Sequence, residues 1–125
     1  LLIMAKILLR SDGKNPVIGD DMPVSFTVTV PSGFGTPTKA WITFKRSKSM
    51  VDADAGVVQK SITSGFTVSG TTLTFTITLA DTDTDDFTPG KYFWDCQVKD
   101  ASGNIATVVP DGEVTWIKGV TDATS

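Results

Sequence analysis

Apolar and polar residues alternate along three segments of the chain, at 24–30, 72–79 and 92–98. In each segment every second residue is mostly a large apolar or aromatic one, and threonine fills many of the positions between. A period of two is typical of a strand with one face in a core and the other in water. Clusters of Gly, Pro, Asn and Asp separate the segments. The pattern predicts an all-β fold, an immunoglobulin-like antiparallel β-sandwich of about seven to nine strands.

Shorter stretches of the same kind complete the expected strand set. Pro110-Asp111-Gly112 is expected to separate the last two strands. Residues 48–62 are ambiguous, and one assignment gives a short helical turn at Ser49–Ala55 followed by an edge strand. The expected strands are Ala5–Leu9, Met22–Val30, Lys39–Arg46, an edge strand Val57–Ile62, the short piece Phe66–Val68, 72–79, 92–98, Ile105–Val109 and Glu113–Lys118. The residues expected to face inward are Val24, Phe26, Val28, Val30, Ala40, Ile42, Phe44, Leu73, Phe75, Ile77, Leu79, Tyr92, Trp94, Cys96 and Val98, with Trp41 facing outward.

Residues 80–90 have the composition of a corner between two strands. Asp and Thr suit a single helical turn with side-chain caps, and Pro89-Gly90 ends the corner. Immunoglobulin-like sandwiches often place a tyrosine just after this corner, where its hydroxyl bonds back to the backbone. Tyr92 is the one tyrosine of the chain and lies at that position. We therefore expect Pro89, Gly90, Tyr92 and Trp94 to have structural roles.

Length and composition fit a single domain spanning residues 1–125. The chain has 125 residues, of which 40% are hydrophobic, and we expect a core over 5–118 and a flexible tail at 119–125. A net charge of −3 does not favour nucleic acid as a partner, because phosphate binding needs a positive surface. No apolar run approaches the roughly 18 residues of a membrane span. We expect neither nucleic-acid nor membrane binding.

The start of the chain lacks the features of a signal peptide. Met4-Ala5-Lys6 is typical of a translation start, which leaves open whether Leu1–Ile3 belongs to the native protein. A single cysteine allows no internal disulfide and fits synthesis in a reducing cytoplasm.

The residue types needed for most catalytic chemistry are missing from the sequence. There is no histidine, which excludes Ser-His-Asp and Cys-His catalysis and histidine metal sites. Cys96 lies in the pattern of a buried strand, and we expect it to act as a small hydrophobic residue of the core. Asp81, Asp83 and Asp85 have part of the spacing of a calcium loop, but Asp86 stands where the loop needs glycine. We expect no enzymatic activity, no cofactor and no metal, with weak calcium binding left open.

Several aromatic and basic residues are candidates for contacts with a binding partner. Trp41 and Trp116 are candidates for stacking on a sugar, although core or interface packing is the commoner role of such residues. Lys45 and Arg46 belong to a local basic cluster, and Phe34 lies in a loop rich in Gly and Pro. These five residues are the candidate interaction sites.

Two groups of short motifs resemble the small immunoglobulin-like domains of tailed-phage virions. The resemblance is to the N-terminal domain of the phage baseplate upper protein family, and it covers roughly Lys6–Thr121. The motifs are Lys39–Ser47, Asp52–Ala55, Val57–Lys60, Leu79–Thr82, Phe87–Tyr92, Asp95–Val98, Asp100, Ser102–Asn104, Gly112–Val114 and Val120–Thr121.

The resemblance implies a role in assembly rather than catalysis. Such domains bind other virion proteins through strand edges and loops, in many symmetric copies, so a homo-oligomer within a virion is expected, made in the cytoplasm of a bacterial host. Position in the tail, in the baseplate or on the head surface stays open. The alternative is an immunoglobulin-like module that binds carbohydrate or another component of a cell surface.

Overall fold

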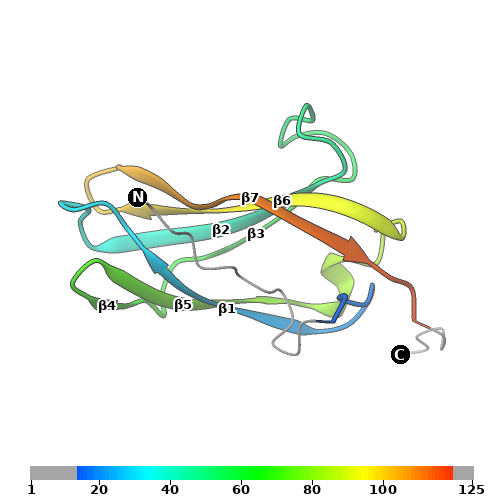
Figure 1. Ribbon diagram of the computed structural model, residues 1–125, viewed down its shortest axis with the longest axis horizontal. Coiled ribbons are helices and arrows are strands. Elements are labelled where there is room, and N and C mark those ends of the chain that lie inside the picture. The colour runs from blue at the N-terminus through cyan, green and yellow to red at the C-terminus, as the bar shows by residue number, and fades with distance from the viewer. Residues whose placement is uncertain (1–13, 120–125) are drawn as a thin grey trace.

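The computed structural model describes residues 14–119, which form two antiparallel sheets packed face to face (Figure 1). One sheet has three strands in the order β1-β5-β4, and the other has four in the order β3-β2-β6-β7. The expected β-sandwich is therefore confirmed. The elements are β1 (Met22–Thr29), β2 (Pro37–Lys45), β3 (Val58–Ile62), β4 (Thr67–Ser69), β5 (Thr72–Leu79), the 3₁₀ turn η1 (Asp81–Asp83), β6 (Gly90–Asp100) and β7 (Ile105–Trp116).

The chain changes sheet three times, after β1, after β3 and after β5, as in an immunoglobulin-like sandwich. Before β1, Val17 forms a parallel bridge with Ile117 at the end of β7. The strand expected at Ala5–Leu9, and the tail beyond Gly119, lie outside the described residues. In the part of the chain that the structure describes, no helix is long and apolar enough to span a bilayer.

The core lies between the sheets and is built by the alternating positions. Phe26 and Phe75 are cross-strand partners whose rings stack at 4.8 Å, and Trp94 packs edge-on to Phe26 from the opposite sheet at 6.2 Å. The inward set expected from the alternation is confirmed, since all fifteen of those residues are buried. The threonines between them on β5 are exposed.

Two local expectations are wrong. Residues 49–55 form successive turns and no helix, with hydrogen bonds such as Asp54 N–H to the Val51 carbonyl at 2.9 Å. The break expected at residues 110–112 is absent, because β7 runs through them while paired with β6. Twice along this pairing β7 uses one residue more than β6, so Pro110 and its neighbours are accommodated in β-bulges instead of ending the strand.

The corner before β6 forms as expected. η1 is a single turn, and the Asp83 carboxylate accepts a hydrogen bond from the Ala80 N–H at 2.6 Å. Gly90 has φ of +135°, a conformation that side chains other than glycine rarely adopt. The Tyr92 hydroxyl accepts a hydrogen bond from the Thr88 N–H at 3.1 Å, which confirms the tyrosine corner. The corner also buries Thr84, whose hydroxyl accepts a bond from the Gly19 N–H at 2.9 Å.

Candidate binding surfaces

A groove lies on the outer face of the four-stranded sheet, with a volume of about 360 Å³. Its floor comes from the outward positions of β2 and β6, and its walls come from the loop after β2 and from the bulged part of β7. Its lining residues are Trp41, Thr43, Lys45, Lys48, Asp52, Phe93, Trp94, Asp95, Gln97, Pro110, Asp111 and Gly112.

Strand register brings the floor residues together. On β2 and β6, Trp41 is the direct partner of Gln97, and Thr43 is the direct partner of Asp95. Partners directly across an antiparallel pair project from the same face, with Cβ atoms about 4.5–5.5 Å apart. An aromatic ring, a hydroxyl, a carboxylate and an amide are thereby placed side by side on a rigid sheet.

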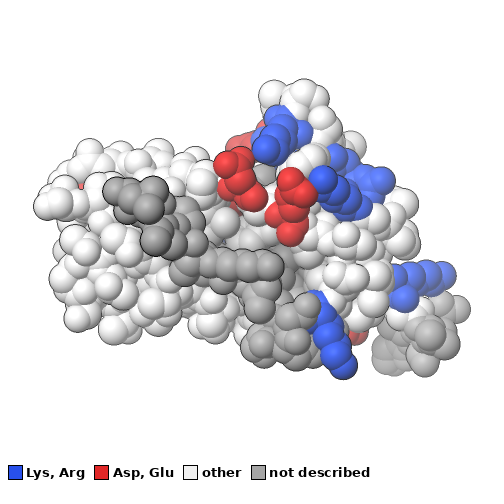
Figure 2. All heavy atoms as spheres, in the orientation of Figure 1, with Lys and Arg blue, Asp and Glu red and all other residues white. Residues whose placement is uncertain are grey.

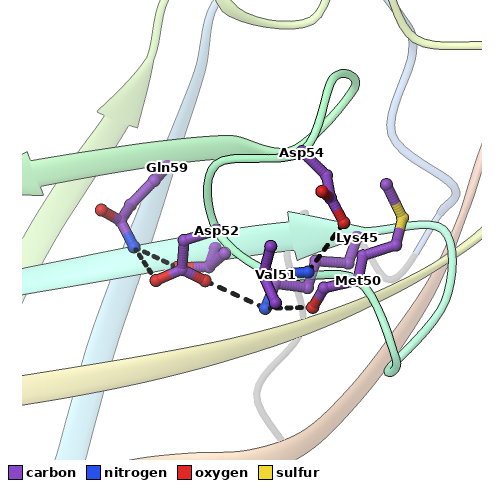
Figure 3. A network of polar contacts seen from close by, with 7 residues as sticks. Lys45, Met50, Val51, Asp52, Asp54 and Gln59 are labelled. Atoms are coloured by element: carbon purple, nitrogen blue, oxygen red, sulfur yellow. Dashed lines mark hydrogen bonds and ion pairs between the residues drawn. The ribbon is translucent and has the colours of Figure 1, made fainter.

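The first wall is the loop at residues 46–57, which projects beyond the sheet (Figure 1). Lys45 holds it, because its Nζ donates to the Met50 carbonyl at 2.9 Å and lies 2.9 Å from the Asp52 carboxylate (Figure 3). Gln59 on β3 adds a bond from its Nε2 to the Asp52 carboxylate at 3.5 Å. The wall is therefore fixed by polar contacts to β2 and β3.

The second wall is the bulged segment of β7. Lys48 in the loop and Asp111 in this segment form an ion pair of 3.3 Å between the two walls. A second exposed pair, Lys91 with Glu113, lies further along the β6–β7 hairpin at 2.8 Å. In the view of Figure 2, acidic and basic side chains gather together over this part of the molecule, whereas the other end is nearly free of charge.

Asp95 differs from the other charged residues of the groove. Its carboxylate forms no hydrogen bond or ion pair with any residue that the structure describes. Partial burial raises the pKa of Asp95, an effect that the positive charge of Lys45 opposes and the negative charge of Asp52 reinforces. The groove thus contains a half-buried acceptor with spare hydrogen-bonding capacity.

A second surface, which we name the loop end, consists of residues 31–36, 69–72 and 101–105. These segments meet at one end of the sandwich, on the left in Figure 1. Hydrogen bonds join them: the Val30 N–H to the Thr71 carbonyl at 2.9 Å, and the Ala101 N–H to the Thr36 carbonyl at 2.9 Å. No charged residue occurs in any of the three segments.

Asp100 holds two of these loops in place. It is buried, and its carboxylate accepts hydrogen bonds from the N–H groups of Gly35, Ser102 and Asn104 at 2.8–2.9 Å and from the Asn104 side chain at 3.0 Å. The bond from Gly35 is the main reason that the pKa of Asp100 lies below its usual range, with the bonds from Asn104 and Ser102 adding to it. The loop end is consequently organised by one ionised carboxylate.

Apolar side chains are exposed at and beside the loop end. Val68 on β4 is 53% exposed and Ile105 at the start of β7 is 58% exposed. β4 lies at the edge of its sheet among the described residues, and its three residues carry no charge and no proline. Natural sheets protect such edges by shortness, charge, proline or a bulge; β4 is short but has no charge or proline, so its backbone groups can pair with a neighbour over three residues.

The candidate contact residues identified from the sequence are dispersed. Trp41 and Lys45 lie in the groove, and Phe34 lies in the loop end, partly buried against the core. Arg46 lies elsewhere: its guanidinium is 4.9 Å from the centroid of the Tyr92 ring, where it covers the tyrosine corner.

Trp116 is not available as a contact residue, so the sugar-stacking candidate is wrong for it and core packing, the other interpretation of the sequence, is confirmed. It is 1% exposed and packs edge-on to Phe44 at 5.6 Å and Phe87 at 5.1 Å. Each of the two bulges adds one residue to β7, so together they leave the alternation unchanged, and Trp116 faces the core like Ala106 and Val108 earlier in the strand. Its indole N–H has no hydrogen-bond partner among residues 14–119.

The other candidates for chemistry, Cys96 and the aspartates of the corner, lie in structural environments. Cys96 is buried, and burial, reinforced by the neighbouring Asp95, raises the pKa of its thiol far above the usual range. Asp83 forms an ion pair with Lys60 at 3.0 Å, while the Asp21 carboxylate accepts a bond from the Asp81 N–H at 2.7 Å. Residues 14–119 contain no group of three or more His, Cys, Asp or Glu placed to hold a metal ion.

Sequence reasoning missed Phe93, Asp95 and Gln97 as groove residues. They occupy the outward positions between the buried residues of β6, so the same alternation that predicted the core could have pointed to them. The role of Asp100 in holding the loops was also missed. The sequence did contain a signal for it, because an aspartate just before a Ser-Gly turn commonly accepts hydrogen bonds from the turn backbone. No protein-family model and no curated protein sequence matches the chain.

Proposed function

We propose that this chain is a non-enzymatic structural protein of a tailed-phage virion, assembling in multiple copies through strand edges and loops. It would contact other virion proteins and further copies of itself, in the tail, in the baseplate or on the head surface, without binding nucleic acid or membrane. The observation that supports this proposal is the uncharged loop end with the open β4 edge beside it.

The buried centre of a protein interface is depleted in charge, and the loop end has none, while exposed Val68 and Ile105 offer apolar area. An open edge strand can add a strand from a neighbour through backbone hydrogen bonds. Contacts that are individually weak gain strength when they are repeated in a symmetric particle.

The oligomeric state of the purified protein tests this proposal. Light scattering over a concentration range, with negative-stain imaging, is expected to show defined rings or small oligomers. Val68→Lys and Ile105→Lys place a charge in the proposed contact and are expected to shift the protein to monomer. Thr78→Lys, on an exposed position of the central strand β5, is the matched control and is expected to assemble as the parent does.

Two results contradict the proposal. One is a monomer at every concentration up to millimolar. The other is assembly that Val68→Lys and Ile105→Lys leave unchanged.

The groove favours a second candidate function, a module that binds carbohydrate at a cell surface. Its floor combines Trp41 with Asp95 and Gln97, an aromatic ring beside polar groups. Small-ligand sites typically combine an apolar platform with a few convergent polar groups in this way. A virion protein that contacts its host could have both functions, because the groove and the loop end occupy different parts of the sandwich.

A further inference from the structure

The charged walls of the groove neutralise one another. Lys45 pairs with Asp52 at 2.9 Å, and Lys48 pairs with Asp111 at 3.3 Å. Each wall cation therefore has an anion beside it, and neither sign dominates the opening. The walls therefore offer no net field to a charged ligand, and the Asp95 carboxylate on the floor is the charge that remains. An anion is disfavoured there, whereas a neutral polar ligand has no repulsion to overcome.

Three aromatic residues line the groove, and Trp41 offers the most open platform, because Trp94 is buried in the core. The Nζ atoms of Lys48 and Lys91 lie 5.3 Å and 5.0 Å from the centroid of the Phe93 ring, so cations already occupy that ring. Trp41 has one such neighbour, Lys39, with its Nζ 5.5 Å from the ring centroid. Half-buried on the outward side of β2, the indole presents a flat apolar surface to the groove.

Two acceptors stand beside that platform. The Asp95 carboxylate has no partner among the described residues. Gln97 uses its Nε2 to donate to the Thr107 hydroxyl at 3.2 Å, which fixes the amide and leaves its Oε1 as an acceptor. A ligand that supplies several hydrogen-bond donors and carries no charge satisfies both groups.

We propose that this groove binds a neutral saccharide, with the C–H face of one sugar ring on Trp41 and the ring hydroxyls donating to Asp95 and Gln97. The volume of about 360 Å³ is at the small end of ligand sites and suits one or two sugar rings. This inference rests on the second candidate function, and it is independent of assembly through the loop end.

The test is a titration followed by backbone-amide and indole NMR signals. The probes are neutral sugars (glucose, galactose, rhamnose, N-acetylglucosamine and lactose), with cationic glucosamine as a contrast. We expect one or more neutral sugars to shift the signals of Trp41, Thr43, Asp95 and Gln97. Trp41→Ala and Asp95→Ala are each expected to weaken binding by about tenfold or more, because each removes one main contact.

Controls separate binding from folding and from assembly. Asp86→Ala removes an exposed carboxylate of the corner and is expected to leave the affinity unchanged. Trp41→Phe keeps a ring and is expected to recover part of the affinity lost in Trp41→Ala, and well-dispersed amide spectra show that each variant is folded. Val68→Lys is expected to bind sugar as the parent does, so that a failure of assembly and a failure of sugar binding are read separately.

Three results overturn the inference. The first is the absence of shifts with every neutral sugar at high millimolar concentration. The second is binding of glucosamine alone, which would identify a cation site at Asp95. The third is a set of shifts outside the groove that Trp41→Ala and Asp95→Ala do not alter.

Discussion

The hydroxyl oxygen of Tyr92 lies 3.1 Å from the backbone nitrogen of Thr88 and accepts its hydrogen bond. The bond joins the start of β6 to residues 80–90, the corner between the two sheets. The ring of Tyr92 stacks on Phe87 at 4.4 Å, and the Arg46 guanidinium lies 4.9 Å from the ring centroid. One side chain thus connects the corner, β6 and the end of β2.

Replacing Tyr92 is expected to destabilise the domain strongly. Tyr92→Phe removes only the hydrogen bond and should cost about 1 kcal/mol in the free energy of unfolding. Tyr92→Ala also removes a buried ring and should cost about 3–5 kcal/mol. Thr76→Ala, at an exposed position of β5, should change that free energy by no more than about 0.5 kcal/mol. Chemical denaturation measures all three, and equal losses for Tyr92→Ala and Thr76→Ala would contradict the structural role of the corner.

Gly112→Ala is expected to destabilise the protein although the backbone there needs no special conformation. A Cβ at this position would lie 2.3 Å from Cε2 of the buried Trp94 ring. The ring has to move within the core, at a cost of about 1–3 kcal/mol. Asp111→Ala, one residue earlier and exposed, is the control and should have a much smaller effect on Tm. A parent-like Tm for Gly112→Ala would mean that Trp94 moves freely.

Acid is expected to weaken the loop end through Asp100. The pKa of this carboxyl is lowered in the folded state, so its contribution to stability is present above about pH 3.9, the ordinary value, and is lost as the pH falls through the lowered pKa. Asp100→Asn should therefore lower Tm by several degrees at neutral pH, with the deficit shrinking in strong acid. Thermal melts from neutral to acidic pH measure this. Asp86→Asn is the control at neutral pH, and a deficit that stayed constant down to the lowest pH would count against ionised Asp100 as the cause.

Asp95→Asn is expected to change Tm in the opposite direction to Asp100→Asn. Burial raises the pKa of Asp95, so the ionised form is disfavoured in the folded protein and stability falls as the pH rises through that pKa. Removing the charge should leave Tm equal to the parent value or raise it at neutral pH, with the difference vanishing in acid. The same melts measure it. A clear loss of Tm in Asp95→Asn would indicate that the carboxylate has a structural partner.

The strands with the clearest alternation were predictable from the sequence, whereas β7 was not. β1 and β5 follow the pattern of one buried and one exposed residue throughout, so the alternation alone assigns their faces. In β7, a proline and a glycine suggested a break, and only the pairing with β6 shows that bulges accommodate them. Trp116 has the same parity along β7 as the buried Ala106 and Val108, because the two bulges together leave the alternation unchanged.

The candidate site was predictable only in part. The outward position of Trp41 followed from the inward positions of Ala40 and Ile42 on either side of it. Its neighbour Gln97 lies 56 residues further along the chain and is adjacent only because β2 pairs with β6 in one register. The unpartnered state of Asp95 likewise depends on which charges in the walls pair with each other.

The sequence was sufficient for most of the strands, the composition of the core and the tyrosine corner. Those features follow from local periodicity and from the backbone preferences of Gly, Pro, Asp and Thr, which act over a few residues. The bulges, the groove around Asp95 and the joining of the loops through Asp100 were settled only in the tertiary structure. These depend on strand register and on contacts between distant residues, which alternation within a single strand does not encode.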